Sequence, residues 1–577
     1  MVNDKLKLLI SYLEKEQKNK IIVLIGLIFF GLIFETFGLG ILLPLLILIL
    51  DYDKFLIYVE NWLPNAELKY ISQSNIILYS FIIVGLIYGF KALFFIYVTY
   101  FQNKIVFSIS KKVKSDLHRN YLECNLSDHN NSDFSTKIKN LQIEVNHFIG
   151  YIQAILATFT EGLFNSGLFI LLIIVDPLQA IIILIFFGAF VGISFFSTRP
   201  FLKRFSELKM NLNNSITSLI IDHLENYKTI YLTMRQNFFV NKFDSFLEKM
   251  MNVNIKSNTL KSSPRFVLEF FVVLLLLLIL IIKLKIGISP TQIITSLGLF
   301  GAALFKVFPS INKIISSTQQ INNFKPMFDL ILGELNHFRK GIKINSNIIS
   351  LNKKLVLQNI SFSYPNSQMR VLNKIKLIIE KGNFIGVIGE SGSGKTTLLE
   401  IMMGFRQQLS GSYLIDNNEI YDPSVIVQSR IFRYLPQEVK LIKGTITENI
   451  AFGYESEKID QKKLINVISQ TKLDQFIESL PKGIDTIIGD KKNNLSGGQR
   501  QRIGLARILY DEPKIILLDE PTSALDSITE QELIKNILKL GLTTILVTHN
   551  KKLLSFCDDY IELDMQNSER LIANISD

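Results

Sequence analysis

The stretch Gly389-Glu390-Ser391-Gly392-Ser393-Gly394-Lys395-Thr396 decides how the C-terminal part of this chain folds. Its spacing, G-x-x-x-x-G-K-[ST], lies between an apolar run at residues 384–388, which predicts a buried strand, and a helical pattern at residues 398–403. Glycines suit such a loop because successive backbone N–H groups turn inward around an anion, and side chains would block that approach. The N-terminus of the helix adds partial positive charge. The stretch therefore predicts a phosphate-binding loop.

Two acidic residues at the end of another strand complete the expected chemistry. Lys395 can reach the β- and γ-phosphates of a nucleotide, and the Thr396 hydroxyl can hold Mg²⁺. The apolar run at residues 515–518 ends at Asp519, which is placed to orient Mg²⁺, and Glu520, which can polarise the attacking water. An isolated Asp-Glu pair is often a solvated turn, but its place after a phosphate loop favours a site for ATP and Mg²⁺.

A third motif, Leu495-Ser496-Gly497-Gly498-Gln499-Arg500-Gln501-Arg502, is a glycine-containing polar turn that opens a helix. It is an anion site of the same physical type as the first loop. A single fold has no need for two γ-phosphate sites so far apart in the chain. The turn is therefore expected to serve a nucleotide held by a partner subunit.

The composition divides the chain of 577 residues into a membrane half and a soluble half. Hydrophobic residues make up 48% and charged residues 20%, but the long apolar runs all lie before about residue 330. Much of the net charge of +11 lies between apolar segments, where cytoplasmic loops would be, so topology explains it better than nucleic acid binding does. The two cysteines, Cys124 and Cys557, give no disulfide framework and no metal motif.

The order of these patterns predicts four parts of the chain. Residues 1–20 form an amphipathic helix on the inner membrane surface, residues 21–333 a transmembrane domain, residues 334–354 a linker, and residues 355–577 an α/β domain with a largely parallel sheet. The transmembrane domain is expected to have six spans with both termini in the cytoplasm, because lysine and arginine crowd its two long connections. The predicted spans are residues 21–50, 75–101, 148–175, 178–196, 266–282 and 291–315.

Residues 355–565 resemble the nucleotide-binding domain of ATP-binding cassette (ABC) transporters, whose signature sequence is present as Leu495 to Gln499. The resemblance implies that Tyr364 stacks on adenine, that Gln437 senses Mg²⁺ and the membrane domain, and that His549 contacts the γ-phosphate. It makes Glu520 the catalytic carboxylate and places Ser523-Ala524-Leu525-Asp526 against the opposite subunit.

The residues that this resemblance places around the cofactors form two sets. Those expected around ATP are Tyr364, Gly389, Ser391, Gly392, Ser393, Gly394, Lys395, Thr396, Thr397, Ser496, Gly497, Gly498, Gln499 and Asp526, and those around Mg²⁺ are Thr396, Gln437 and Asp519. Asn550 stands where the family often has arginine. No catalytic position is degenerate, so the resemblance implies that the protein hydrolyses ATP.

One membrane half joined to one cassette is half a transporter, so a second copy of the chain is expected to complete it. The layout of six spans with long connections looks like the type IV ABC exporters, and it implies a homodimer with the cassettes in the cytoplasm. Residues 122–134 and about 222–236 are then expected to be the coupling helices that rest on the cassettes. ATP binding would close the dimer, and hydrolysis would reset it.

The substrate has to be inferred from the membrane half. Lys91, Arg265 and Lys306 lie in or at the edge of apolar helices, where charge is costly and usually functional. A positively lined cavity suits a phosphate or pyrophosphate head group. The alternative is that Lys91 and Arg265 extend to the membrane interface and that Lys306 pairs with Glu35 or Glu269.

The membrane half also resembles PglK-type lipid-linked oligosaccharide flippases in the segments Glu35-Thr36-Phe37, Ser263-Pro264-Arg265 and Phe305 to Lys313. This resemblance implies an undecaprenyl-pyrophosphate-linked glycan as the substrate, moved across a bacterial cytoplasmic membrane. Lysine at positions 91 and 306 replaces the arginine expected there, which keeps the charge but loses bidentate pairing with phosphate. The polar loop at residues 51–74 is expected to carry a short external helix around Trp62.

Two other interpretations stay open. One is an exporter of another lipid, a drug or a peptide, which stimulation of ATP hydrolysis by candidate substrates would distinguish. The other is a non-transporting ABC regulator or channel, which degenerate catalytic residues would favour.

Overall fold

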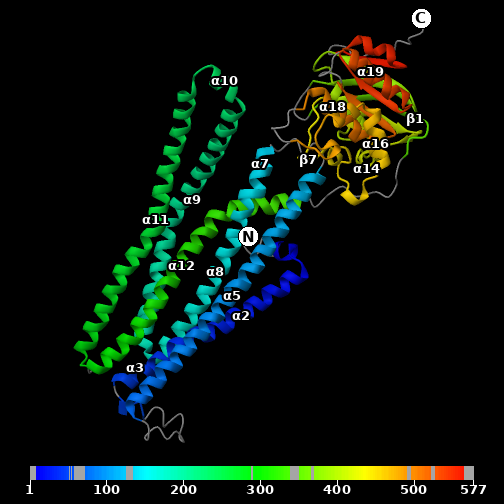
Figure 1. Cartoon of the computed structure of the whole chain (residues 1–577). Coiled ribbons are helices and arrows are strands. Elements are labelled where there is room, and N and C mark those ends of the chain that lie inside the picture. Colours follow the sequence, from blue (N-terminus) through cyan, green and yellow to red (C-terminus); the bar gives the residue numbers. More distant parts are fainter. Residues whose placement is uncertain are drawn as a thin grey trace. The chain divides into compact units, whose positions relative to one another are not determined.

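The computed structural model describes residues 8–50, 52–53, 55–56, 72–124, 134–287, 290–337, 350–364, 369–489, 495–521 and 527–564. The chain divides into two compact units, and Figure 1 shows their elements. The first unit is Met1–Leu122 with Asp133–Arg339, and the second is Lys340–Asp577 with Glu123–Ser132.

The first unit is built from long helices. Its helical elements are α2 (Lys15–Gly40), α3 (Leu42–Leu50), α5 (Gln73–Glu123), α7 (Phe134–Lys139), the π-helical turn η2 (Asn140–Glu144), α8 (Val145–Val175), α9 (Pro177–Glu225), α10 (Tyr227–Leu232), α11 (Gln236–Lys285) and α12 (Pro290–His337). In the described part of the chain, five helical segments are long and apolar enough to cross a membrane: residues 15–50, 73–123, 136–175, 177–225 and 236–285. The sixth predicted span, residues 291–315, lies in α12.

Two kinds of apolar surface distinguish these helices from those of a water-soluble bundle. Large apolar side chains such as Leu86 and Leu93 are 70% and 68% exposed, as residues that face lipid would be. Inside the unit, Val106 of α5, Phe148 of α8 and Ile331 of α12 belong to one buried cluster. The spans therefore bury a core on one side and leave apolar residues on the other.

The structure differs from the predicted helix over residues 1–20. Residues 8–12 are helical, the chain breaks at Leu13 and Glu14, and α2 begins at Lys15. Glu14 and Gln17 form a capping box that starts the new helix, because each side chain accepts a hydrogen bond from the other's backbone. Leu9 and Leu13 are buried against the bundle instead of lying free on a surface.

Several predicted segments lie wholly or partly outside the described residues. These are the helix around Trp62, residues 125–133 of the first expected coupling helix and residues 338–349 of the linker. The second expected coupling segment, residues 222–236, contains the end of α9 and the short helix α10.

The second unit contains two main sheets. The parallel sheet has the order β11-β3-β10-β9-β6, and a second sheet, β2-β1-β4-β5, is antiparallel throughout. The strands are β1 (Lys354–Phe362), β2 (Leu372–Glu380), β3 (Phe384–Gly389), β4 (Ser410–Ile415), β5 (Asn418–Glu419), β6 (Phe432–Leu435), β7 (Gly444–Thr445), β8 (Ile487–Ile488), β9 (Ile515–Asp519), β10 (Thr543–Val547) and β11 (Asp559–Leu563). The antiparallel sheet is an addition to the predicted parallel one.

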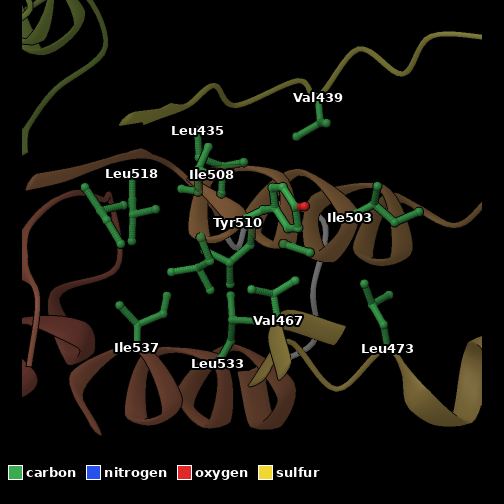
Figure 2. Close-up of a cluster of buried hydrophobic side chains, with 14 of the residues drawn as sticks. Leu435, Val439, Val467, Leu473, Ile503, Ile508, Tyr510, Leu518, Leu533 and Ile537 are labelled. Carbon is green, nitrogen blue, oxygen red and sulfur yellow. The ribbon is translucent and has the colours of Figure 1, made fainter. Parts of the chain in front are cut away.

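Besides its strands, the second unit contains helices and 3₁₀ turns. They are α13 (Lys395–Met402), α14 (Ser424–Ser429), α15 (Ile446–Ile450), α16 (Gln461–Gln470), α17 (Asp474–Glu478), α18 (Gly497–Tyr510) and α19 (Ser527–Lys539), with the 3₁₀ turns η4 (Ser456–Lys458), η5 (Gly483–Asp485) and η6 (Lys551–Phe556). Alternate residues of β9 belong to different cores, Ile516 and Leu518 to one and Ile515 and Leu517 to the other. Figure 2 shows Leu518 in the first core, with Ile503 of α18 and Leu533 of α19. Burial on both faces explains the continuous apolar run that ends at Asp519.

Candidate functional site

The predicted phosphate loop connects β3 to α13. Gly392 and Gly394 have φ values of 87° and 95°, a backbone region that favours glycine. A Cβ atom at Gly389 would lie 2.5 Å from both the Leu563 carbonyl oxygen and the Ser393 hydroxyl oxygen. The sequence needs these glycines because the loop turns tightly and closely approaches β11.

Lys395 and Ser393 have the properties expected of phosphate ligands. The Lys395 Nζ atom donates to the carbonyl oxygens of Gly389 at 2.8 Å and Glu390 at 2.9 Å, so the ammonium lies over its own loop. Burial lowers the pKa of Lys395, although the carboxylates of Glu520 and Asp519 act in the opposite direction. The buried Ser393 hydroxyl has no hydrogen-bond partner among the described residues. An incoming phosphate would supply an acceptor to both groups.

Asp519 lies at the end of β9, next to the loop, where its side chain is only 8% exposed. Burial raises the pKa of Asp519, while hydrogen bonds from Tyr434 and Thr396 lower it. The Tyr434 hydroxyl donates to Asp519 Oδ2 at 2.9 Å, and burial raises the pKa of Tyr434 as well. Asp519 and Thr396 therefore bring two side-chain oxygen donors together, and oxygen is the ligand type that Mg²⁺ prefers.

The structure brings three predicted residues, Glu520, Gln437 and His549, into contact. Gln437 Nε2 donates to Glu520 Oε2 at 2.7 Å, and His549 Nε2 lies 2.6 Å from Glu520 Oε1. Glu520 has a φ of 46°, which is uncommon for a residue other than glycine and often marks a functional site. Its backbone N–H donates to the Val547 carbonyl of β10 at 3.0 Å.

Tyr364, the residue expected to stack on adenine, is 38% exposed. Its hydroxyl lies 3.0 Å from the Thr397 hydroxyl, and the Arg406 guanidinium lies 4.7 Å from its ring centre. Arg406 is held in turn by an ion pair with Glu400 of α13. The ring is thus fixed next to the phosphate loop while part of its surface remains open.

The turn with the signature sequence is closed by hydrogen bonds within itself. The Gln499 backbone N–H donates to the Ser496 hydroxyl at 3.1 Å, and the Ser496 backbone N–H donates to Gln499 Oε1 at 2.9 Å. This capping box starts α18, so the N-terminus of a helix of 14 residues opens at Ser496, Gly497 and Gly498. Asp526 and the residues before it, Ser523-Ala524-Leu525, lie outside the described residues.

Sequence reasoning missed Tyr434 and Arg406 and gave no role to Asn550. Tyr434 could be found only from the sheet order, which puts β6 beside β9 and pairs Tyr434 with Leu517. Asn550 accepts from the Lys552 backbone N–H at 3.1 Å and donates to Glu530 of α19 at 2.9 Å. It therefore caps the 3₁₀ turn that follows His549 and fixes that turn to a neighbouring helix.

In the membrane unit, Glu35 joins two of the three predicted cations. Lys91 Nζ lies 3.0 Å from Glu35 Oε2, and Lys306 makes an ion pair with the other carboxylate oxygen. Glu35 and Lys91 are buried, whereas the Lys306 side chain is 43% exposed. Lys306 and Glu35 line a cavity of about 470 Å³ between α2, α5, α8 and α12. Arg265 is exposed on α11 and does not line this cavity.

Comparison with known proteins agrees with both halves of this description. The family description "ABC transporter" matches residues 372–523, and "ABC transporter transmembrane region" matches residues 20–306. An ATP-dependent lipid A-core flippase of Idiomarina loihiensis is 25% identical over 88% of each chain. A putative export ATP-binding/permease protein of Rickettsia felis is 25% identical over 96% of this chain and 93% of its own.

A solved structure shows the same fold over almost the whole chain. It is a bacterial Atm1-family ABC exporter with ATP bound, which superposes with a TM-score of 0.79 and covers 95% of this chain and 94% of its own at 18% identity. The phosphate loop, Asp519 and the matched families make ATP with Mg²⁺ the cofactor. This chain therefore belongs to the ABC transporters, as an ATP-driven exporter of the type IV fold that joins a transmembrane domain to an ATPase cassette.

Proposed function

We propose that two copies of this chain form a homodimer that flips a lipid-linked oligosaccharide, joined to its lipid through pyrophosphate, across the bacterial cytoplasmic membrane. The cassettes and both termini are placed in the cytoplasm. The observation that carries the proposal is Lys306, which presents positive charge to a cavity in the membrane domain. A phosphate-bearing head group is the matching ligand.

The charges around Glu35 support an anionic head group. Lys91 and Lys306 both pair with this one carboxylate, so the cluster keeps one positive charge. The Glu35 side chain is 4% exposed and the Lys306 side chain is 43% exposed. The charged group that a ligand in the cavity can contact is therefore the Lys306 ammonium. An intramembrane charge of this kind is usually functional. The relative named as an ATP-dependent lipid A-core flippase supports a lipid as the substrate.

In the ATP site, different residues of one chain would bind the phosphates, bind Mg²⁺ and activate the attacking water. Lys395 and Ser393 would hold the phosphates, and Thr396 and Asp519 would hold Mg²⁺, which stabilises the charge that develops on the transferred phosphate. Glu520 would accept a proton from the attacking water, with Gln437 and His549 fixing its two carboxylate oxygens. The Ser496 turn of the second copy would close the site over the nucleotide.

The role of Glu520 is tested by Glu520→Gln. The amide keeps the shape of the side chain but cannot take a proton, so steady-state ATP hydrolysis is expected to fall by about 10²–10⁴-fold. The variant is expected to retain bound ATP in a closed dimer, measured by nucleotide retention and size. Glu512→Gln, at an exposed acid paired with Lys463, is the matched control. Normal turnover in Glu520→Gln would show that the catalytic assignment is wrong.

The substrate is tested in proteoliposomes by the flipping rate of an undecaprenyl-pyrophosphate-linked glycan. Lys306→Met leaves Glu35 paired with Lys91 and is expected to reduce that rate by about tenfold or more, since an ionic hydrogen bond contributes about 1.5–3 kcal/mol. Lys256→Met, at an exposed position of α11, controls for loss of a lysine. Flipping by Lys306→Met at the normal rate rejects the cavity role. Stimulation of ATP hydrolysis by a drug or peptide, but not by this lipid, would identify a different exporter.

A further inference from the structure

A second polar cluster lines the cavity that contains Lys306. It consists of Glu161 and Asn165 on α8 and Ser310 and Lys313 on α12. Asn165 Nδ2 donates to the Ser310 hydroxyl at 2.9 Å, and that hydroxyl donates to Glu161 Oε2 at 2.6 Å. Lys313 Nζ donates to the other carboxylate oxygen of Glu161 at 2.7 Å. The chain of hydrogen bonds fixes all four side chains.

This cluster has an excess of hydrogen-bond acceptors. Asn165 is 6% exposed, and its buried Oδ1 atom has no partner among the described residues. Pro309 has no N–H group to donate to the carbonyl of Phe305 in α12, and both residues line the cavity. A buried acceptor without a donor costs about 1–3 kcal/mol. A ligand that donates hydrogen bonds is therefore favoured.

The charges exclude two simple classes of ligand for this cluster. Glu161 and Lys313 neutralise each other, while the Glu35 cluster leaves one positive charge in the same cavity. A cationic ligand would be repelled, and a fully ionised phosphate has no hydrogen to donate to Asn165. A neutral group with several hydroxyls satisfies both conditions.

The walls and the spacing also fit a sugar. Phe95, Phe164 and Phe305 line the cavity, so an apolar face of a sugar ring can pack against an aromatic side chain there. The volume of about 470 Å³ is typical of small-molecule sites. Lys306 and Ser310 share one face of α12, about 6 Å apart along its axis, which suits a phosphate followed directly by a sugar.

We propose that Asn165, Ser310 and Glu161 bind the hydroxyl groups of the first sugar attached to the pyrophosphate. Lys306 binds the phosphate and the second cluster binds the sugar. The cavity therefore recognises the part of the lipid where the sugar is joined to the pyrophosphate. The inference rests on the proposed function, since it describes another part of the same substrate.

The test compares undecaprenyl pyrophosphate with and without one linked N-acetylhexosamine. The readout is the lipid concentration that half-maximally stimulates ATP hydrolysis by the full-length protein in nanodiscs. In the unmodified protein, the sugar is expected to lower this concentration about tenfold, the value of one good hydrogen bond. Asn165→Leu and Ser310→Ala are expected to remove that difference by weakening only the sugar-bearing lipid. Ser166→Ala, an exposed neighbour whose hydroxyl bonds to Leu163, is expected to keep it.

Equal half-maximal concentrations for the two lipids, or a difference that survives both substitutions, overturn the sugar site. The failure of the proposed function gives a different result, in which neither lipid stimulates the unmodified protein. In that case the sugar site is tested with octyl β-glucoside, which carries a sugar but no phosphate. Octyl phosphate, which carries a phosphate but no sugar, is the control ligand. Asn165→Leu is expected to raise the effective concentration of the glucoside about tenfold and leave that of the phosphate unchanged. If octyl β-glucoside has the same effective concentration in Asn165→Leu and in the unmodified protein, the proposed sugar site is wrong.

Discussion

At the scale of single residues, the ATP site of this chain holds groups that are poorly satisfied before nucleotide binds. In the part of the chain that the structure describes, the Lys395 ammonium donates to two neutral carbonyl oxygens, the Ser393 hydroxyl has no partner, and Asp519 is a carboxylate buried at the end of a strand. Each of these groups gains a better partner from a phosphate or from Mg²⁺. These groups therefore lower the stability of the nucleotide-free protein and raise its affinity for ATP and Mg²⁺, a compromise that is common at functional sites.

This view predicts that Asp519→Asn stabilises the protein in the absence of nucleotide. Burial raises the pKa of Asp519, so the folded state disfavours the ionised form. The resulting loss of stability is complete above the raised pKa, and it disappears as the pH falls toward the ordinary value of 3.8. At pH 8 the variant is therefore expected to melt about 2–4 °C higher, the shift that 1 kcal/mol gives in a domain of this size.

The measurement is thermal unfolding of nucleotide-free protein at several pH values. The gain is expected to shrink with decreasing pH, and hydrolysis of ATP with Mg²⁺ is expected to be lost at every pH. Asp485→Asn, at an exposed position, should change neither property. A variant that melts below the unmodified protein at pH 8 would contradict the assignment of strain to Asp519.

Much of the ATP site could be predicted from the sequence because its residues follow buried strands or form contiguous motifs. Asp519 and Glu520 were predicted from the apolar run before them, and the glycines from the loop spacing. Tyr434 and Arg406 were not, because each reaches its partner from an element distant in sequence. The pairing of Lys306 with Glu35 was one of the alternatives predicted from the sequence and is confirmed. The pairing of Lys91 with the same carboxylate was not predicted, because it depends on the packing of α5 against α2.

At the scale of elements, hydropathy and length predicted the five segments that are long and apolar enough to cross a membrane. Short elements and the pairing between strands were not predicted. The break at Glu14 depends on a capping box that reuses two ordinary polar residues, Glu14 and Gln17. The antiparallel sheet includes β5, which has only two residues and therefore carries no periodic pattern. Its pairing partners become evident only in the folded chain.

Close packing of α2 against α8 leads to a prediction about these two elements. A Cβ atom at Gly167 of α8 would lie 2.3 Å from Leu32 and 2.6 Å from Thr36 of α2. Gly167→Ala is therefore expected to destabilise the membrane domain by about 1–3 kcal/mol, the usual cost of overpacking. Gly162 lies on the same helix with nothing within 4 Å of such an atom, which makes Gly162→Ala a matched control.

The two variants are compared by thermal unfolding of the full-length protein in detergent. Only Gly167→Ala should melt earlier, because small residues at helix contacts allow the close approach of transmembrane helices. Equal melting temperatures of the two variants would mean that α2 and α8 can move apart at this position without a loss of stability.

At the scale of the whole molecule, the proposed homodimer would build each nucleotide site from two different motifs of the chain. The phosphate loop contains Lys395, whose ammonium donates to the Gly389 carbonyl oxygen, and the helix N-terminus at Ser496 is capped by the side chains of Ser496 and Gln499. In the proposed homodimer, each loop meets the Ser496 turn of the other copy. This arrangement predicts how inactivating substitutions combine in mixed dimers.

The prediction uses Lys395→Ala to disable the loop and Ser496→Arg to block the turn. When the two substitutions are on different chains, one composite site in the mixed dimer loses both parts and the other stays intact, so ATP hydrolysis should persist at a reduced level. When both are on one chain paired with an unmodified chain, each composite site loses one part, and hydrolysis should be abolished. The two chains of each mixed dimer carry different affinity tags, and purification on one tag and then the other isolates the mixed dimers. The rate of ATP hydrolysis is then measured for each of the two combinations. Sites complete within single chains would reverse the two results, because the unmodified chain would then stay active and the separated substitutions would leave none intact.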